Sequence, residues 1–413
     1  MIGYVGPFGD TNFGDYAMLV NDVYDIDEKD IKLFTYNQEV TEDISYRYFK
    51  DYNVTVVPVH IAWTYEKIKE GTTASHSLCN HLYVPSEIID IIQNKEHVES
   101  ELADLDTLVV TGGGYFNYYW TANTRMPKLL SIFGVLFMAQ SLGKRIVFLG
   151  NTYGPFEVAT DFFRFCLGRL QNAKIMARDS LYSCLYMKTL GINNVCSLPD
   201  DLYFVNYRLH SSGGGIKHPY AIFETCISIK EIEENASHIR RFMDDLKKNL
   251  NVDIYLLPLD SRYGGYIQAE TINRLCPDTK IITEVSNKGL LSIENALYYV
   301  KNAQFILCQK YHLFTFGIAN NIPTVQLVRG IWGDKRYTYM KSIGMLDNTF
   351  HNQLYDETQF LINDFGILPK LNVQAIINYQ NTLFNSKKKE QEQLMLDQRK
   401  AFIEQFCKGS PSN

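Results

Sequence analysis

The sequence predicts an α/β protein with two domains, each built on a parallel β-sheet between layers of helices. The chain has 413 residues, which is long enough for two domains of ordinary size. Short apolar runs alternate with amphipathic segments, and this alternation is typical of parallel sheets with helical crossovers. A glycine-rich stretch, 211–219, separates two series of such alternations and predicts a linker between the domains.

Composition excludes several classes of protein. Hydrophobic residues make up 46% of the chain and charged residues 21%, which is the balance of a globular protein rather than a disordered one. A net charge of −6 argues against a protein that coats nucleic acid. The eight cysteines form no CxxC pair, so we expect reduced thiols rather than zinc ligands or disulfides.

No segment has the pattern of a signal peptide or a membrane span. The chain opens on a strand-like run, and its longest apolar segment, 129–142, is too short to cross a bilayer. We therefore expect a cytoplasmic protein, free or at the inner face of the membrane, with at most peripheral membrane contact. The basic run Lys387, Lys388 and Lys389 fits either such contact or a docking helix with a solvated face.

In the first half, strands are predicted at 2–5, 31–36, 54–59 and 106–111, with a helix at 16–23. The loop 6–15 is rich in glycine, and its spacing fits a ligand cradle and a tight turn equally. Gly112, Gly113 and Gly114 follow the strand 106–111 and leave room for a ligand or for a crowded turn; the position at a strand end favours the ligand.

The next elements are a buried helix at 127–142, a strand at 145–149, a helix at 161–170 and a strand at 174–177. Arg178 follows the last of these, where its guanidinium can bind a carboxylate or phosphate, or pair with Asp179. A helix at 181–190 and a strand at 195–198 complete this series.

After the linker, strands are predicted at 220–223, 253–258, 280–283, 303–307 and 324–328. Helices are predicted at 232–249, 267–275, 292–301 and 313–319, and a final helical segment at 373–407. Lys310 and His312 lie between a strand and a helix, and open α/β sheets bind ligands at such strand ends. The helix N-terminus there would add N–H donors for an anion.

Two α/β domains and a final helix that can cross back suggest the GT-B architecture, with two Rossmann-like domains facing a cleft. Several motifs in order resemble the polysaccharide pyruvyl transferase family: Asn12-Phe13-Gly14-Asp15, 106–114, Gly154-Pro155, Ala177-Arg178-Asp179-Ser180, Asp200, Lys310-Tyr311-His312, Ile322-Pro323 and 333–344. The resemblance covers about residues 1–345. Two departures stand out, because the family usually has Arg at the position of Lys310 and Pro at the position of Asp201.

The resemblance implies an enzyme that transfers the pyruvyl group of phosphoenolpyruvate onto two hydroxyls of a sugar. The product is a cyclic ketal in a precursor of a cell-surface polysaccharide, such as a capsule or exopolysaccharide, and the acceptor is a sugar, lipid-linked or free. Phosphoenolpyruvate is the co-substrate, and we expect no other cofactor and no metal.

Roles for individual residues follow from the resemblance and from the chemistry. We expect His312 to transfer a proton, since an imidazole titrates near neutral pH, and Asp15 to act as the base or to anchor a sugar hydroxyl. Donor-binding residues are predicted to be Arg178, Lys310, Tyr311 and Lys335, and cleft-lining residues Asn12, Gly14, Gly112, Gly113 and Gly114.

The predicted domains are an acceptor-side domain at 1–210, the linker at 211–219, a donor-side domain at 220–370 and a helical segment at 371–408.

Two other functions fit the same pattern. One is a GT-B glycosyltransferase that uses a nucleotide sugar, with the cation and helix N-terminus on a diphosphate. The other is a non-catalytic sugar-binding or assembly protein that keeps the cleft but not the chemistry.

Overall fold

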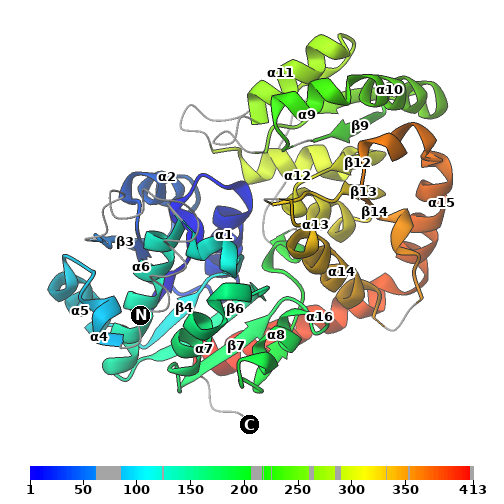
Figure 1. Cartoon of the computed structure of the whole chain (residues 1–413). Helices are drawn as coiled ribbons and strands as arrows, with labels where there is room; N and C mark the ends of the chain where they lie inside the picture. Colours follow the sequence, from blue (N-terminus) through cyan, green and yellow to red (C-terminus); the bar gives the residue numbers. More distant parts are fainter. Residues whose placement is uncertain are drawn as a thin grey trace. The chain divides into compact units, whose positions relative to one another are not determined.

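The computed structural model consists of two compact units, each with its own parallel sheet (Figure 1). It describes residues 1–61, 85–122, 125–205, 216, 218–224, 226–259, 265–283, 290–331, 333–351 and 354–409. The N-terminal unit comprises Met1–Asp10, Asp15–Asp201 and Met395–Asn413, and the C-terminal unit comprises Thr11–Gly14 and Leu202–Leu394. Each unit therefore includes a short segment that is distant in sequence from the rest of it: 395–413 in the N-terminal unit and 11–14 in the C-terminal unit.

The sheet of the N-terminal unit has the order β3-β2-β1-β4-β6-β7-β8, with β5 also paired to β6, and every pairing is parallel. Its strands are β1 (Ile2–Val5), β2 (Asp30–Thr35), β3 (Asn53–Pro58), β4 (Thr107–Val110), β5 (Gly113–Phe116), β6 (Arg145–Tyr153), β7 (Ala173–Ala177) and β8 (Val195–Ser197). The α-helices of the described residues are α1 (Phe13–Ile26), α2 (Gln38–Tyr48), α4 (Pro85–Ile89), α5 (Lys95–Ala103), α6 (Met126–Ser141), α7 (Thr160–Gly168) and α8 (Ser183–Thr189).

The sheet of the C-terminal unit has the order β11-β10-β9-β12-β13-β14, again with parallel pairings only. Its strands are β9 (Tyr220–Phe223), β10 (Asp253–Leu256), β11 (Lys280–Ile281), β12 (Phe305–Cys308), β13 (Thr324–Leu327) and β14 (Leu361–Ile362). The α-helices between and after them are α9 (Ile229–Glu234), α10 (Ala236–Leu250), α11 (Gly265–Leu275), α12 (Ile293–Asn302), α13 (Tyr311–Ala319), α14 (Arg336–Phe350), α15 (Val373–Leu383) and α16 (Lys389–Phe402).

The strand order reverses once in each sheet. In the N-terminal unit the chain runs from β1 to β3 in one direction, and β4 then pairs on the other side of β1. In the C-terminal unit β12 pairs with β9 on the side away from β10. Right-handed crossovers on the two sides of such a point lie on opposite faces, and open α/β sheets bind their ligands there, at the carboxyl ends of the strands.

The structure confirms the predicted α/β class with two parallel sheets and a C-terminal helix. It corrects the prediction of one helix at 232–249, which is two helices that meet at Asn235. The first begins earlier than predicted, because Ser228 and Glu231 form a capping box. Helix α14 and strand β14 were not predicted, and the linker 211–219 lies outside the described residues except at 216, 218 and 219.

The end of α13 is closed by a lysine from the C-terminal helical segment. The Lys388 ammonium donates to the carbonyl oxygens of Ile318 at 2.7 Å and Ala319 at 2.8 Å, and to the side chain of Asn321. These carbonyls lie at the negative end of the helix dipole, and that of Ile318 also accepts from the backbone N–H of Asn321 at 3.2 Å. Burial lowers the pKa of Lys388 to about 8, so the ammonium stays mostly protonated at neutral pH.

We expect Lys388→Met to lower the free energy of unfolding by about 1–3 kcal/mol, because buried carbonyls lose their charged donor. Urea denaturation measures this change. Lys370→Met is the matched control, since Lys370 is an exposed lysine of the same unit, and its loss should leave stability nearly unchanged. Equal stability of the two variants would contradict a capping role for Lys388.

Candidate functional site

Charged side chains gather at the switch point of the C-terminal sheet. Glu224 follows β9, Lys310 follows β12, and Arg329 comes shortly after β13. These three strands are neighbours and parallel, so their carboxyl ends share one edge of the sheet. The structure thus places Lys310 where the sequence predicted a cation, and it adds a carboxylate and a guanidinium that the sequence analysis missed.

Glu224 fixes the turn between β12 and α13. Its side chain is 4% exposed, and Oε2 accepts hydrogen bonds from the backbone N–H groups of Gln309 and Lys310, each at 2.9 Å. Burial raises the pKa of Glu224, while these amides and the charges of Lys310 and Arg329 favour its carboxylate. The side-chain amide of Gln309 makes a second contact in this turn: its Oε1 accepts from the backbone N–H of Cys226 at 2.7 Å.

Helix α13 carries the predicted motif in its first turn. Lys310 is the N-cap residue and is half-buried, Tyr311 is 3% exposed, and His312 is half-buried. The ammonium of Lys341, on α14, lies 4.7 Å from the centre of the Tyr311 ring. This cation–π contact places a further positive charge beside the start of α13.

His312 lies directly against Gly14. A Cβ atom added to Gly14 would come within 2.3 Å of three ring carbons, Cγ, Cδ2 and Cε1 of His312. Equal distances to three ring atoms mean that the imidazole faces the Cα atom of Gly14, so a side chain at this position would require the ring to move. Beside this contact the rings of Phe13 and Phe316 meet edge to face, with centroids 5.5 Å apart.

The segment Thr11–Gly14 packs with the C-terminal unit, so Asn12 and Gly14 belong to the surroundings of α13. Asp15 is the next residue, in the first turn of α1, and it is 6% exposed. Its carboxylate is one of the charges that raise the pKa of Tyr115, after burial and Tyr153. The structure therefore gives Asp15 a buried position and leaves its role in proton transfer a prediction.

Lys335 is an exposed residue at the N-cap of α14, and its ammonium donates to the carbonyl oxygen of Asn363. Its side chain lies beside the loop that follows β13, because a Cβ atom on Gly330 would be 3.7 Å from Lys335 Cγ. Contact of Lys335 with a donor stays a prediction.

Gly112, Gly113 and Gly114 follow β4, and the space beside the first of them is taken by a side chain of the protein. A Cβ atom on Gly112 would lie 2.0 Å from Oδ2 of Asp201, and one on Gly150 would lie 2.9 Å from both oxygens of the same carboxylate. Gly113 and Gly114 begin β5, which pairs with β6. At Gly112 the space is therefore filled by a buried side chain, and a ligand contact by any of the three glycines stays a prediction.

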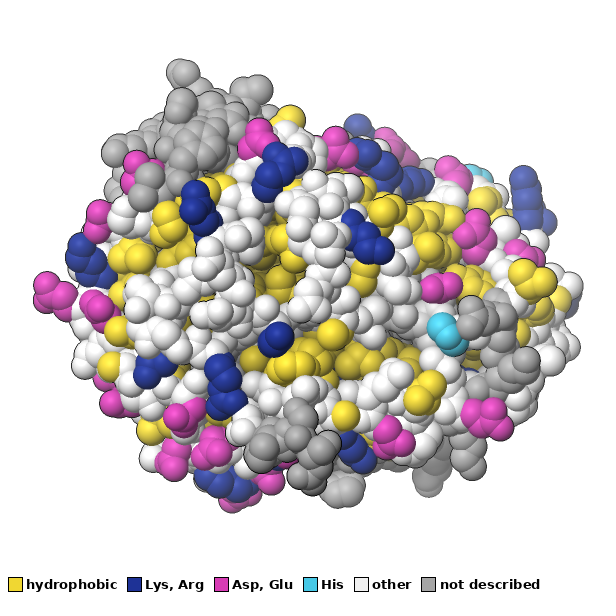
Figure 2. Space-filling view, turned by 90° about the horizontal axis from the view of Figure 1, so that it is seen from below, with side chains coloured by type: hydrophobic (Ala, Val, Ile, Leu, Met, Phe, Trp, Pro, Cys, Tyr) yellow, Lys and Arg dark blue, Asp and Glu magenta, His cyan; other side chains and the backbone are white. Residues whose placement is uncertain are grey.

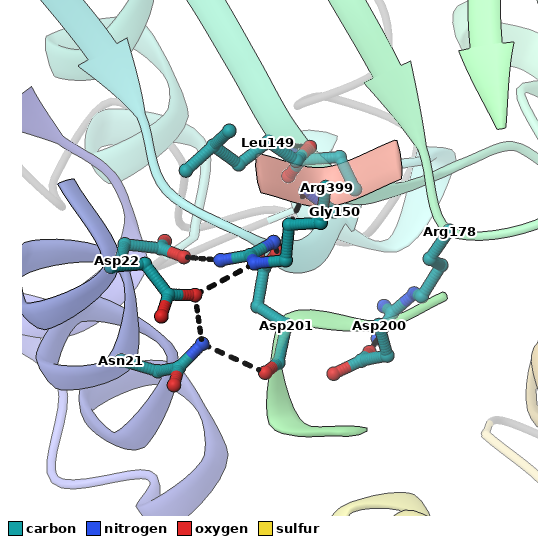
Figure 3. A network of polar contacts seen from close by, with 10 residues as sticks. Asn21, Asp22, Leu149, Gly150, Arg178, Asp200, Asp201 and Arg399 are labelled. Carbon is teal, nitrogen blue, oxygen red and sulfur yellow. Dashed lines mark hydrogen bonds and ion pairs between the residues drawn. The ribbon is translucent and has the colours of Figure 1, made fainter. Parts of the chain in front are cut away.

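Arg178, at the end of β7, is engaged within the N-terminal unit. Its guanidinium is 2% exposed and donates to the carboxylate of Asp200 and to the hydroxyl of Thr152. Figure 3 shows Arg178 beside Asp200. Asp179, the alternative partner, instead accepts from Ser183 and from two backbone N–H groups. The geometry favours a structural role for Arg178, and donor binding by it stays a prediction.

A second buried guanidinium lies next to this pair (Figure 3). Arg399, on α16, donates to the carboxylates of Asp22 and Asp25, each at 2.8 Å, and to that of Asp201. Asp22, Asp201 and Arg399 are at most 1% exposed, so three carboxylates share one cation in a buried site. Burial raises the pKa of Asp22 and of Asp201, and a neighbouring carboxylate raises each further against the effect of Arg399.

We expect Arg399→Met to lower the free energy of unfolding by about 3–5 kcal/mol at pH 8, because it leaves buried carboxylates without a cation. The loss should be smaller at pH 5. A raised pKa means that the folded chain binds more protons than the unfolded chain, so stability rises as pH falls below the folded-state pKa.

Guanidinium denaturation at the two pH values measures both effects. Arg164→Met is the control, since Arg164 pairs on the surface with Asp161, three residues away. A loss for Arg399→Met that is equal at pH 5 and pH 8, or equal to that of the control, would contradict the assigned charge balance.

Within the ranges that the structure describes, no group of three His, Cys, Asp or Glu side chains could hold a metal ion. Across these same residues, none of the helices combines the length and the apolar character needed to cross a membrane. Figure 2 shows one face of the molecule, on which Lys and Arg side chains occur together with Asp and Glu side chains. That face has the mixed charge expected from the overall balance of −6.

Solved structures share the fold across the whole chain. One is a Listeria monocytogenes protein described as a UDP-N-acetylglucosamine 2-epimerase, with 8% identity, a TM-score of 0.59 and coverage of 99% of this chain and 97% of that one. Another is UDP-GlcNAc 2-epimerase from Neisseria meningitidis bound to UDP-GlcNAc, with 10% identity, a TM-score of 0.51 and coverage of 96% and 98%. At these identities the likeness shows the fold alone, which is the predicted GT-B fold.

No curated protein matches the sequence of this chain significantly. The model of the polysaccharide pyruvyl transferase family matches residues 12–328, which is well over half of the chain. The matched range begins in the segment that carries Asn12 and Gly14 and ends at the close of β13, so it includes Lys310 and His312. The chain belongs to the polysaccharide pyruvyl transferase family.

Proposed function

We propose that this enzyme transfers the pyruvyl group of phosphoenolpyruvate onto two hydroxyls of a sugar in a cell-surface polysaccharide precursor. The product is a pyruvate ketal, and phosphate is released. The observation that carries the proposal is the Lys310-Tyr311-His312 motif at the β9/β12 switch point, in a chain whose family acts in polysaccharide pyruvylation. This is where a parallel α/β sheet binds its ligands.

The charges of this site suit the donor. Phosphoenolpyruvate carries a carboxylate and a phosphate, and it needs cations and N–H donors. Lys310, Arg329 and Lys341 are half-buried cations around the start of α13. The N-terminus of α13 adds the favourable end of a helix dipole. Lys335, Tyr311 and Arg178 remain further candidate donor ligands.

The reaction needs two proton transfers. Protonation of the methylene carbon of the donor makes its central carbon an electrophile, and a sugar hydroxyl that loses its proton attacks this carbon. The bond to phosphate breaks, and the second hydroxyl closes the ring. The two hydroxyl protons end on the new methyl group and on phosphate, so the reaction balances without a cofactor.

We assign the methylene proton transfer to His312 and propose Asp15 as the base or sugar anchor. An imidazole is suited to this step because its pKa is close to neutral pH. The flat contact with Gly14 holds the His312 ring in one orientation. Asp15 follows Gly14 directly in the chain, which supports a role in the same reaction.

We infer that the enzyme works in the cytoplasm or at the inner face of the membrane, on a lipid-linked or free sugar acceptor. Phosphate release from phosphoenolpyruvate, with galactoside and mannosamine-type acceptors, tests the reaction, and mass spectrometry identifies the ketal.

We expect His312→Ala to abolish phosphate release while its melting temperature stays within a few degrees of that of the unchanged protein. His351→Ala is the control, because His351 is an exposed histidine that follows α14. Full turnover by His312→Ala would remove this residue from the mechanism. Stabilisation of the protein by nucleotide sugars alone in thermal-shift measurements would instead favour a glycosyltransferase.

We expect Gly14→Ala to lower the turnover number by on the order of 100-fold, because the added methyl group displaces the His312 ring from its position. Gly168→Ala is the matched control, since a Cβ atom there meets no atom within 4 Å. Helicity by circular dichroism should be unchanged in both variants. Wild-type turnover by Gly14→Ala would show that His312 does not depend on this contact.

A further inference from the structure

Arg329 reaches across the carboxyl edge of the C-terminal sheet. It follows β13, and its Nη1 donates to Sγ of Cys226, 2.7 Å away, in the segment that follows β9. Strand β12 lies between β13 and β9 in the sheet. The side chain therefore passes over the end of β12, where Gln309 and Lys310 begin the turn into α13.

Glu224 lies near enough to this guanidinium for the charge of Arg329 to favour its carboxylate. The charges of Lys310 and Arg329 both favour the Glu224 carboxylate, although no ion pair within 4.0 Å joins Arg329 to it among the described residues. The Oε2 atom of Glu224 is used by two backbone N–H groups. The buried carboxylate thus interacts with both charges, and among the described residues it takes no hydrogen bond from Arg329.

Arg329 differs from three other arginines of the chain. Arg178 pairs with the carboxylate of Asp200, Arg399 pairs with three carboxylates, and Arg336 pairs with Asp334 at 2.8 Å. Within the described part of the chain, the contact with the Cys226 thiol is the hydrogen bond that Arg329 makes. A thiol is a weak acceptor, so the guanidinium keeps its capacity for an oxyanion.

We propose that Arg329 binds the carboxylate of the donor and that Lys310 binds its phosphate. A guanidinium offers two parallel N–H groups that match the two oxygens of a carboxylate, whereas an ammonium acts as a point charge. Arg329 thereby supplies the planar recognition that Lys310 cannot supply. This assignment rests on the proposed use of phosphoenolpyruvate and adds a donor ligand to it.

Steady-state kinetics of Arg329→Gln, Arg329→Lys and Arg336→Gln test the assignment. Arg329→Gln should raise the KM for phosphoenolpyruvate at least about tenfold, the loss typical of a charged hydrogen bond, with kcat changed by less than about threefold. Arg329→Lys keeps the charge without the fork and should also raise KM. Arg336→Gln removes an equal charge from a surface pair and should leave KM unchanged.

Inhibition by pyruvate and by inorganic phosphate separates the two ends of the donor. Arg329→Gln should weaken inhibition by pyruvate about tenfold and leave that by phosphate within about threefold. An unchanged KM would overturn the proposal, and so would weaker inhibition by phosphate alone.

The binding test does not need turnover. If the wild-type protein releases no phosphate from phosphoenolpyruvate, the proposed function fails, but thermal shifts with pyruvate still report on Arg329. A pyruvate-induced shift that is lost in Arg329→Gln and kept in Arg336→Gln would support the carboxylate site. Equal shifts in both variants, or no shift of the wild-type protein, would overturn it.

Discussion

The N-terminal unit depends on the pairing of Arg399 with three carboxylates. This contact joins α1, the turn after β8 and the C-terminal helix, which are separated by up to 377 residues in the chain. A guanidinium can satisfy all three partners because its N–H groups point in different directions in one plane. Without it, the buried negative charges of Asp22 and Asp201 would repel each other at low dielectric.

The position of Asp201 also explains two glycines of this unit. The Asp201 carboxylate occupies the space beside Gly112 and Gly150 that a Cβ atom would need. Asp200, which precedes Asp201, pairs with Arg178. The two adjacent aspartates therefore each bind a different arginine. A residue without a carboxylate at 201 would leave Arg399 with fewer partners, which gives a physical reason for an acidic residue there.

The two units use charge in different ways. In the N-terminal unit, Arg178 and Arg399 are buried and pair with carboxylates, so their donors are used in holding the fold. In the C-terminal unit the buried carboxylate of Glu224 accepts from the backbone N–H groups of Gln309 and Lys310, and the charges of Lys310 and Arg329 favour it. The cations at this switch point are the physical basis for the proposed binding of an anionic donor.

The sequence by itself determined the fold class, most strands and the place of His312. Buried parallel strands are continuous apolar runs, and the residues that follow them lie at the ligand-binding edge, so Lys310 and His312 could be found locally. The same rule applied to β9 and β13 would have found Glu224 and Arg329. Only the tertiary structure decided which groups each buried charge contacts, because Arg399 meets Asp201 over 198 residues and Glu224 meets the backbone N–H of Lys310 over 86. Such pairings depend on how distant elements pack, and no local pattern encodes them.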